Sequence, residues 1–377
     1  MKKYFALTLS SILLASSASA EKGRDKELTY IMENPYEVQM IQAPEGGKVK
    51  NVILMIGDGM SLAHIASAWS ANRGHLYLEN AEATGLSITT CLDKLITDSG
   101  AGGTALASGK KTNYHSVGVD GNGDPAISLV DYAHDNGLSS GVTVTCRLWD
   151  ATPADFCCHV VDREMEDQIM AQYVDTKADV VVGPGWSKMI NRADGRDLFK
   201  ELRDKGFKTP RSLEEMATIK DGKIFCVTDS FDVPLPAVRG NWLERAALQT
   251  VEHLNKNPKG FFLMIEGSQL DDYGHFNDLS LLMEETHDFD RTIGAMFKWA
   301  AQNGETLVVV TADHETGGLT LVDGNLEEGK IVGKFSTGGH SGTMVPVYAF
   351  GPGAEEFTGI YHNTEVANKI RKLLNLK

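Results

Sequence analysis

The sequence predicts an α/β fold: a three-layer sandwich with a large, mostly parallel central sheet and helices on both faces. Apolar β-rich runs recur along the chain with helical patterns between them, which is typical of parallel sheets. Several runs are continuously apolar, as expected for strands covered on both faces. The composition, with 42% apolar and 23% charged residues and 38 glycines among 377 residues, is that of a globular enzyme rich in loops.

The expected strands are short apolar runs that end at polar or glycine-containing segments. In chain order they are Asn51–Ile56, Gly85–Thr90, Gly141–Thr145, Val180–Val182, Ile224–Val227, Phe261–Ile265, Thr306–Thr311 and Val345–Phe350. Helices are expected between them, where apolar residues recur at helical spacing. These are Leu62–Asn72, Leu129–Asn136, Arg163–Val174, Asp197–Lys205, Trp242–Asn255, Leu279–Gln302 and Thr364–Leu374.

The first 20 residues have the pattern of a secretory signal peptide. Lys2 and Lys3 precede an apolar run over 4–15, and Ala18-Ser19-Ala20 supplies small residues at a cleavage site. The run is too short to span a membrane. We expect cleavage after Ala20, a periplasmic or secreted protein and no membrane anchor afterwards. Residues 21–377 are expected to form a single domain with a small embellishment near 184–240, where Pro and Gly mark loops.

The formal charge of −15 argues against a nucleic-acid-binding surface and against an anionic membrane as a partner. An anionic substrate would therefore need bound cations or an arginine to reverse the sign locally. The five cysteines, an odd number, allow one or two disulfides or buried thiols, and they lack the spacing of a structural zinc site. No catalytic role is expected for them.

Acidic residues follow three of the expected strands. Asp58 comes after Val52–Ile56, Glu266 after Phe261–Ile265 and Asp313 after Leu307–Thr311. In open α/β sheets, ligands bind beyond the carboxyl ends of the strands. The three side chains are therefore expected to converge on one edge of the sheet.

Two glycine-rich segments offer further polar groups. Asp58 lies between two glycines, which permit a close approach of the backbone to a ligand, although a helix N-cap is an equal alternative for Asp58 taken alone. Ser99 begins a run of small residues that leads into a helix, where amide donors and the helix dipole would favour a phosphate. An ordinary N-cap serine is the simpler interpretation of Ser99 by itself.

Histidines complete the candidate site. Asp271 and His275 are four residues apart, so a helical turn would place both on one face to hold one cation. Asp313 and His314 can serve one metal only if the strand has ended there. His340 lies between Gly338-Gly339 and Gly342, and these glycines would let the backbone carry its ring to a metal.

Thr152 and Arg163 lie downstream of the strand Gly141–Thr145. Thr152 supplies an oxygen ligand just before a helix, and Arg163 has a planar, permanently charged fork suited to a phosphate. A solvated surface position is the common fate of such an arginine, and His159 nearby fits a structural histidine better than a ligand. Aspartate and histidine suit zinc, whereas an Asp, Glu and Thr oxygen set suits magnesium. Together these residues predict a metal-dependent phosphatase.

These motifs, taken together over 51–343, resemble those of the alkaline phosphatases. The resemblance implies a homodimeric hydrolase of small-molecule phosphate monoesters with two Zn²⁺ and one Mg²⁺ per subunit. It implies that Ser99 is the phosphorylated nucleophile and Arg163 the phosphate clamp. The implied metal ligands are Asp271, His275 and His340 for the first zinc, Asp58, Asp313 and His314 for the second, next to Ser99, and Asp58, Thr152 and Glu266 for magnesium.

Two positions depart from the pattern of the family. Asp272 follows the first zinc's aspartate, where relatives often carry a basic or aromatic residue, and Asp150 stands where many relatives carry histidine. We expect both acids to weaken phosphate retention by like-charge repulsion, and Asp150 to favour magnesium over zinc at the third site. The short stretch between His314 and His340 leaves no room for the large insertion of bigger relatives.

Other reactions of the same superfamily remain as alternatives. A sulfatase would need a Cys or Ser in a C/S-x-P-x-R setting, which Ser99 lacks, and the leader peptide argues against a cytoplasmic phosphosugar mutase. A phosphodiesterase is a closer competitor, as is an exported non-catalytic binder of phosphate or metal. Such a binder would be expected to lose Ser99 or Arg163, and both are present.

Overall fold

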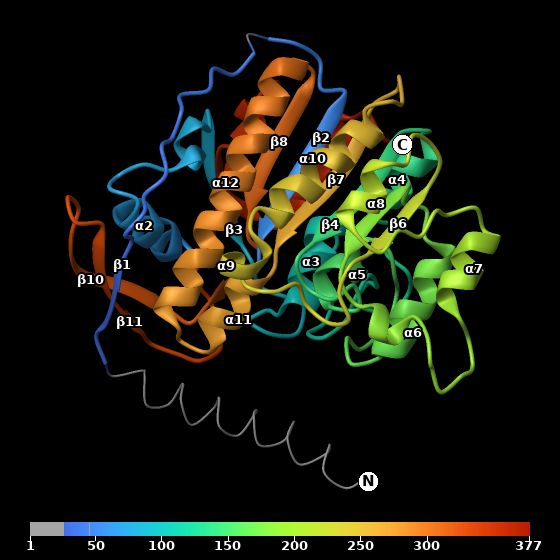
Figure 1. The fold of residues 1–377 in the computed structure, drawn as a ribbon, viewed down its shortest axis with the longest axis horizontal. Coiled ribbons are helices and arrows are strands. Elements are labelled where there is room, and N and C mark those ends of the chain that lie inside the picture. Colours follow the sequence, from blue (N-terminus) through green and yellow to red (C-terminus); the bar gives the residue numbers. More distant parts are fainter. Residues whose placement is uncertain (1–25, 45) are drawn as a thin grey trace, which may run out of the picture.

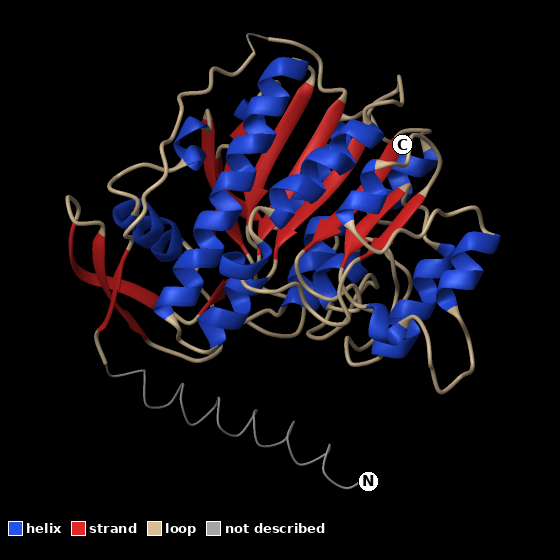
Figure 2. Ribbon diagram, in the orientation of Figure 1, coloured by secondary structure: helices blue, strands red, loops and turns tan. Residues whose placement is uncertain are grey.

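A computed structural model describes residues 26–44 and 46–377, so the expected signal peptide, 1–20, lies outside the described residues. A nine-stranded sheet forms the centre of the protein (Figures 1 and 2). Neighbouring strands are parallel except for β13, which is antiparallel to both of its neighbours. Across the sheet the order is β14 (Gly359–His362), β3 (Ala83–Ile88), β13 (Val345–Phe350), β8 (Thr306–Thr311), β2 (Asn51–Gly57), β7 (Phe261–Gly267), β4 (Ser139–Val144), β5 (Val180–Gly183) and β6 (Ile224–Val227). The expected α/β fold with a mostly parallel sheet is confirmed.

Helices cover both faces of the sheet, and the central strands are therefore buried on both sides. Along β2 the side chains alternate, so Val52 and Leu54 pack into one apolar core and Ile53 and Met55 into the other. The first core is covered by α3 (Ser99–Ser108), α4 (Leu129–Asp135), α5 (Ala151–Asp155), α6 (Glu166–Gln172), α7 (Leu198–Asp204) and α13 (Thr364–Leu373). The second core is covered by α2 (Leu62–Ala71), α8 (Leu213–Ala217), α10 (Trp242–Leu254) and α12 (Leu279–Asn303).

Several elements were not expected from the sequence. A three-stranded antiparallel sheet of β1 (Leu28–Ile31), β11 (Lys330–Phe335) and β10 (Leu319–Asn325) lies beside α2 at one end of the molecule (Figure 1). The two-residue strands β9 (Glu315–Thr316) and β12 (His340–Ser341) pair with each other, and β14 was also unforeseen.

Some of the expected bounds were wrong. The helix expected to start at Arg163 begins at Glu166, because Arg163 lies in a loop in which its amide donates to the carbonyl of His115 at 2.8 Å. The strand expected at Gly85–Thr90 lies two residues earlier. Residues 184–240 contribute α7, α8, the edge strand β6 and the short helix α9 (Pro236–Arg239).

The structure also bears on the expectations about disulfides and about membrane-spanning segments. All five cysteines, which lie within the described part of the chain, are free thiols, and four of them are buried. Within that same part of the chain, no helix has the length and apolar character needed to cross a membrane.

Candidate metal centre and active site

Three neighbouring strands bring the candidate carboxylates together. β8, β2 and β7 are parallel, and Ile56 of β2 pairs with Thr311 on one side and Glu266 on the other. Asp58 follows β2 directly and Asp313 comes two residues after the end of β8, so both lie with Glu266 at the carboxyl edge of the sheet. The expected convergence at that edge is what the structure shows.

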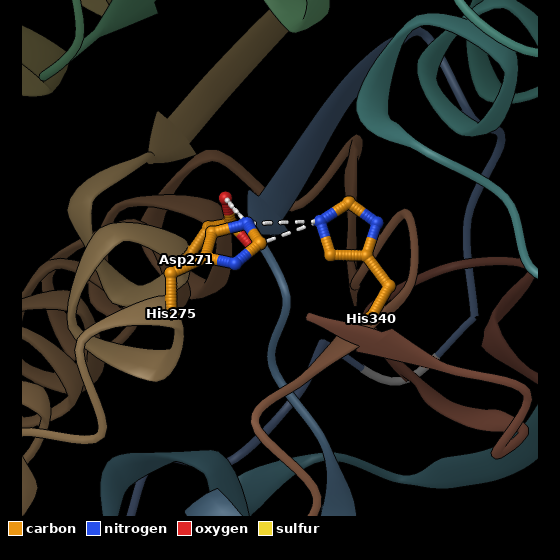
Figure 3. A group of neighbouring side chains, drawn as sticks. All are labelled: Asp271, His275 and His340. Atoms are coloured by element: carbon orange, nitrogen blue, oxygen red, sulfur yellow. Dashed lines mark hydrogen bonds and ion pairs between the residues drawn. The ribbon is translucent and has the colours of Figure 1, made fainter. Parts of the chain in front are cut away.

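Asp271, His275 and His340 form a first group at this edge (Figure 3). Helix α11 (Gln269–His275) places Asp271 and His275 one turn apart, and His275 Nε2 lies 3.2 Å from Asp271 Oδ2. His340, from β12, brings its Nε2 to 3.1 Å from His275 Nε2 and 3.5 Å from Asp271 Oδ1. One ligand atom from each residue lies within 4.8 Å of the other two, so all three are able to reach one cation.

Backbone carbonyls fix the orientation of both rings in this group. His275 Nδ1 donates to the carbonyl of Gly338 at 2.9 Å, and His340 Nδ1 donates to that of Thr97 at 2.8 Å. Each ring therefore turns Nε2 toward the centre of the group, which is the nitrogen that a cation bound there would contact. Burial alone would lower the pKa of His275, but attraction to Asp271 outweighs it and raises that pKa to about 9.

Asp58, Asp313 and His314 form a second, fully buried group. His314 Nε2 lies 3.1 Å from Asp313 Oδ2 and 3.5 Å from Asp58 Oδ1. Because β8 ends at Thr311, Asp313 and His314 are free of the strand's alternation and point to the same place. Burial, followed by repulsion from Asp313, Asp271 and Glu266, raises the pKa of Asp58 well above its usual range.

Ser99 lies beside the second group. It is the first residue of α3, and its Oγ is 3.2 Å from His314 Nε2. The N-cap is Asp98 rather than Ser99, since Asp98 Oδ1 accepts from the amide of Ala101 at 3.3 Å. The Ser99 hydroxyl is therefore not used as a cap, and it stands at the positive end of the helix.

Glu266 and Thr152 lie near the second group but belong to neither triad. Thr152 is in the first turn of α5, and both side chains are buried. Burial raises the pKa of Glu266 to about 8, whereas hydrogen bonds from Ser268 and Thr152 act in the opposite direction. Asp58 also lies close enough to Glu266 for their charges to interact.

Arg163 borders an open cleft of about 330 Å³ in front of the first group. Its Nη1 donates to Asp98 Oδ2 at 3.0 Å and its Nη2 to Asp150 Oδ1 at 2.8 Å. The lining of the cleft is mostly polar and includes Asp271, His275, His340, Asp98, Asp150, Arg163, Asp272 and Arg147. His159 does not line the cleft, and its ring contacts the carbonyl of Gly118.

Two residues at the site were not found from the sequence. Thr316 donates to Asp271 Oδ1 and lies 3.2 Å from His314 Nδ1, so it contacts a member of each triad. Arg147 Nη2 lies 3.0 Å from Asp150 Oδ2 on the wall of the cleft. The only sequence signal for Arg147 was a cation three residues before Asp150, in the loop that follows an expected strand.

The donor atoms fit divalent cations. Among the described residues, the buried oxygens Asp58 Oδ1 and Glu266 Oε1 have no hydrogen-bond partner. Such groups are costly to bury unless a cation or another partner satisfies them. The two triads combine carboxylate and imidazole, the ligands of zinc, whereas Asp58, Glu266 and Thr152 offer only oxygen, which suits magnesium.

Comparisons with known proteins show which family the chain is similar to. The alkaline phosphatase family model matches residues 49–332. Alkaline phosphatase 4 of Bacillus subtilis is 32% identical over 412 aligned positions, which cover 87% of this chain and 89% of that protein. The structure of alkaline phosphatase from the Antarctic bacterium TAB5 superposes with a TM-score of 0.84 at 36% identity and covers 88% of this chain and 99% of its own. A TAB5 variant with aspartate in place of a histidine, with Mg bound in its M3 site, superposes with the same TM-score at 35% identity and covers 89% and 99%.

Proposed function

The chain belongs to the alkaline phosphatase family and is a phosphoric monoester hydrolase, and we propose that it acts through a phosphoserine intermediate on Ser99. The observation that carries the proposal is the position of the Ser99 hydroxyl. It lies 3.2 Å from His314 of one candidate metal triad, at the edge of the sheet where the second triad and Arg163 also gather.

We assign two Zn²⁺ and one Mg²⁺ to these ligands. Asp271, His275 and His340 would hold the first zinc, and Asp58, Asp313 and His314 the second. Asp58, Thr152 and Glu266 would hold magnesium, with Asp58 shared between the last two cations. The unpaired oxygens of Asp58 and Glu266 support this assignment. The Mg bound in the M3 site of the TAB5 variant, which has aspartate in place of a histidine, supports magnesium as the cation of the third site.

When bound, the cations supply positive charge that favours the serine alkoxide and the departing ester oxygen. The hydroxyl proton of Ser99 passes to water, and Ser99 Oγ forms a bond to phosphorus in line with the ester oxygen. The phosphorus–oxygen bond to the leaving group breaks, and the departing oxygen takes up a proton from water and leaves as the alcohol. Arg163 donates to the non-bridging oxygens, where charge accumulates in the transition state. Water next breaks the phosphorus bond to Ser99 Oγ, a proton returns to that oxygen, and inorganic phosphate leaves.

The amides at the start of α3 support the same step. Ser99 occupies the first turn of this helix, and a phosphate bound to it would lie at the helix N-terminus, where amide N–H groups and the helix dipole favour an anion. Asp98 caps the helix and also accepts from Arg163, so a single carboxylate positions both the nucleophile's helix and the clamp.

Export, cleavage after Ala20, a periplasmic or secreted location, a homodimer and a single domain over 21–377 complete the proposal. The leader pattern supports export, and the sequence's family resemblance supports the dimer.

A metal-restoration assay tests this function. The protein is stripped with a chelator and assayed on p-nitrophenyl phosphate before and after Zn²⁺ and Mg²⁺ are restored. We expect activity to be lost on chelation and regained when the metals are restored. With metals present, the kcat of Ser99→Ala should be lower than that of the wild type by about a thousandfold or more. Ser280→Ala, a change of the same kind at an exposed position on α12, is the control. Full activity of the stripped protein or of Ser99→Ala would refute the proposal. Preferential cleavage of bis(p-nitrophenyl) phosphate would instead favour the phosphodiesterase alternative.

A further inference from the structure

A continuous series of ion pairs borders the cleft, and four of its five members, Asp98, Arg147, Asp150 and Arg163, line it. Asp232 accepts from Arg147 Nη1 at 3.2 Å, and Arg147 Nη2 reaches Asp150 Oδ2 at 3.0 Å. Asp150 Oδ1 accepts from Arg163 Nη2 at 2.8 Å, and Arg163 Nη1 donates to Asp98 at 3.0 Å. All five side chains are at most one quarter exposed, so solvent screens these charges only in part.

The net charge of this series of ion pairs is negative and would not attract an anion. Three carboxylates face two guanidinium groups, and the carboxylate of Asp150 is shared between both of them. Without Arg147, Arg163 would be the one cationic partner of Asp150 within this series of ion pairs. Arg163 would then stand between two unshared carboxylates, and the cleft beside it would repel phosphate.

Arg163 has donors left for a substrate only if its carboxylate partners stay in place. A guanidinium carries five N–H groups, and the two hydrogen bonds to Asp98 and Asp150 use one group on each Nη. Because Arg163 lines the cleft and these two bonds use only two of its five N–H groups, the other three are available to an anion there.

We propose that Arg147 is a positioning residue for phosphate: it neutralises Asp150 and thereby keeps Arg163 available to the anion. This inference rests on the proposed function. Arg147 is itself held by the loop that follows β6. Its backbone amide donates to Asp232 Oδ1 at 2.8 Å, and its guanidinium lies 4.8 Å from the ring centroid of Phe231. The loop after β6 therefore contributes to the phosphate subsite through Arg147.

The test measures the dissociation constant of inorganic phosphate by calorimetry on the metal-loaded protein, together with kcat and KM for p-nitrophenyl phosphate. Arg147→Gln is expected to raise the phosphate dissociation constant about tenfold and to raise KM in parallel. Arg147→Lys keeps the charge without the planar fork and should recover most of the affinity. Arg196→Gln removes an arginine from an exposed ion pair with Glu201 and is the matched control, expected to bind phosphate as the wild type does.

Two further variants separate an electrostatic role from a merely structural one. Asp232→Asn weakens the ion pair that positions Arg147 but leaves the positive charge of Arg147 in place. The affinity for phosphate should therefore stay within about twofold of the wild type or increase. In an Asp150→Asn background the charge that Arg147 neutralises is gone. Adding Arg147→Gln there should change the dissociation constant by less than about twofold, which is a strong departure from additivity.

Three results would overturn the inference. They are an unchanged dissociation constant in Arg147→Gln, a loss in Asp232→Asn as large as that in Arg147→Gln, or a full tenfold effect of Arg147→Gln in the Asp150→Asn background. Each of these leaves the proposed function intact, because the wild-type protein would still hydrolyse monoesters. An inactive metal-loaded wild type would instead refute the function itself.

Discussion

The acidic side chains of the site differ in how their charges are balanced. Asp271 is paired with two histidines, which hold its pKa well below the usual range although burial opposes them. Asp150 is paired with two arginines, so the repulsion expected from its charge is offset. Asp272 lines the cleft, and burial followed by repulsion from Asp271 raises its pKa to about 7. Of the two acids that depart from the family pattern, Asp272 is the one expected to repel phosphate.

Reversing the charge at Asp272 tests this difference. Asp272→Lys places a cation beside the phosphate position, and we expect the inhibition constant of inorganic phosphate to fall about tenfold. Slower product release should lower kcat at the same time. Asp323→Lys, the same substitution on the exposed strand β10, controls for net charge. An unchanged inhibition constant in Asp272→Lys would contradict the repulsion.

Single residues were predictable from the sequence where they stand next to a strong pattern. Asp58, Glu266 and Asp313 follow apolar strands, and helical spacing linked Asp271 to His275. Thr316 and Arg147 carry no such mark, because each acts through a partner that is distant in the fold or lies in an irregular loop. Their roles depend on tertiary contacts that no local pattern encodes.

The small residues of α3 allow the helix that carries Ser99, the proposed nucleophile, to pack closely against Asp313, a proposed metal ligand. A Cβ at Gly102 would lie 2.8 Å from the backbone oxygen of Asp313, closer than side chains tolerate. A Cβ at Gly103 would meet the carboxylate of Asp155. The run of glycines in this helix therefore serves packing as well as loop formation, at some loss of helix propensity.

Gly102→Ala is expected to push α3 away from Asp313 and displace Ser99. Overpacking of this kind typically costs about 1–3 kcal/mol of stability. We expect kcat/KM to fall by about tenfold or more even at temperatures where the variant is fully folded, because in-line attack depends on the position of Ser99. Ser108→Ala, at the far end of the same helix, controls for helix stability. Normal kcat/KM in folded Gly102→Ala would contradict the packing argument.

Helix α12 holds the N-terminal segment through a buried acid. Asp290 accepts from the Tyr36 hydroxyl at 2.6 Å and from the amides of Tyr77 and Leu78. Burial raises the pKa of Asp290 to about 6, although these hydrogen bonds oppose it. Between about pH 4 and pH 6 the folded state binds this proton more tightly than the unfolded state, so the free energy of unfolding falls as pH rises through that window.

Comparison with Asp290→Asn isolates this effect. The difference in unfolding free energy between wild type and variant should decline by about 2 kcal/mol from pH 4 to pH 6.5. Urea titrations of both proteins, with zinc and magnesium present throughout, measure it. A difference that does not change with pH, or that grows as pH rises, would show that Asp290 does not titrate in this range.

Buried elements were far easier to predict than exposed ones. The eight expected strands all belong to the central sheet, and its central strands β2, β7 and β8 are buried along their whole length. Strands β10 and β14 are largely exposed, so they lack an apolar run that would mark them. The start of α6 was predicted three residues too early, because residues 163–165 have a helix-like composition but lie in a loop.

For the whole molecule, an acidic protein must bind an anionic substrate. The formal charge is −15, and four carboxylates (Asp58, Asp271, Asp313 and Glu266) interact at one edge of the sheet. Bringing them together destabilises the folded state unless cations are present. Metal binding is therefore expected to contribute to stability as well as to catalysis.

Removal of metal should lower the melting temperature. We expect chelation to lower Tm by at least about 5 °C, and restored Zn²⁺ and Mg²⁺ to reverse the change. Calorimetry at constant pH and ionic strength measures it. An identical Tm with and without the cations would contradict this expectation, because it would mean that the repulsion among the four carboxylates is relieved without bound metal.

The most direct test of the account is to identify the phosphorylated residue. Metal-loaded enzyme is incubated with substrate, quenched in acid and digested, and the peptides are analysed by mass spectrometry. A single phosphoryl group on Ser99, absent when the substrate is omitted and absent in Ser99→Ala, is the predicted result. Turnover with no phosphorylated residue, or with the phosphoryl group on another side chain, would contradict the assignment of Ser99 as the nucleophile.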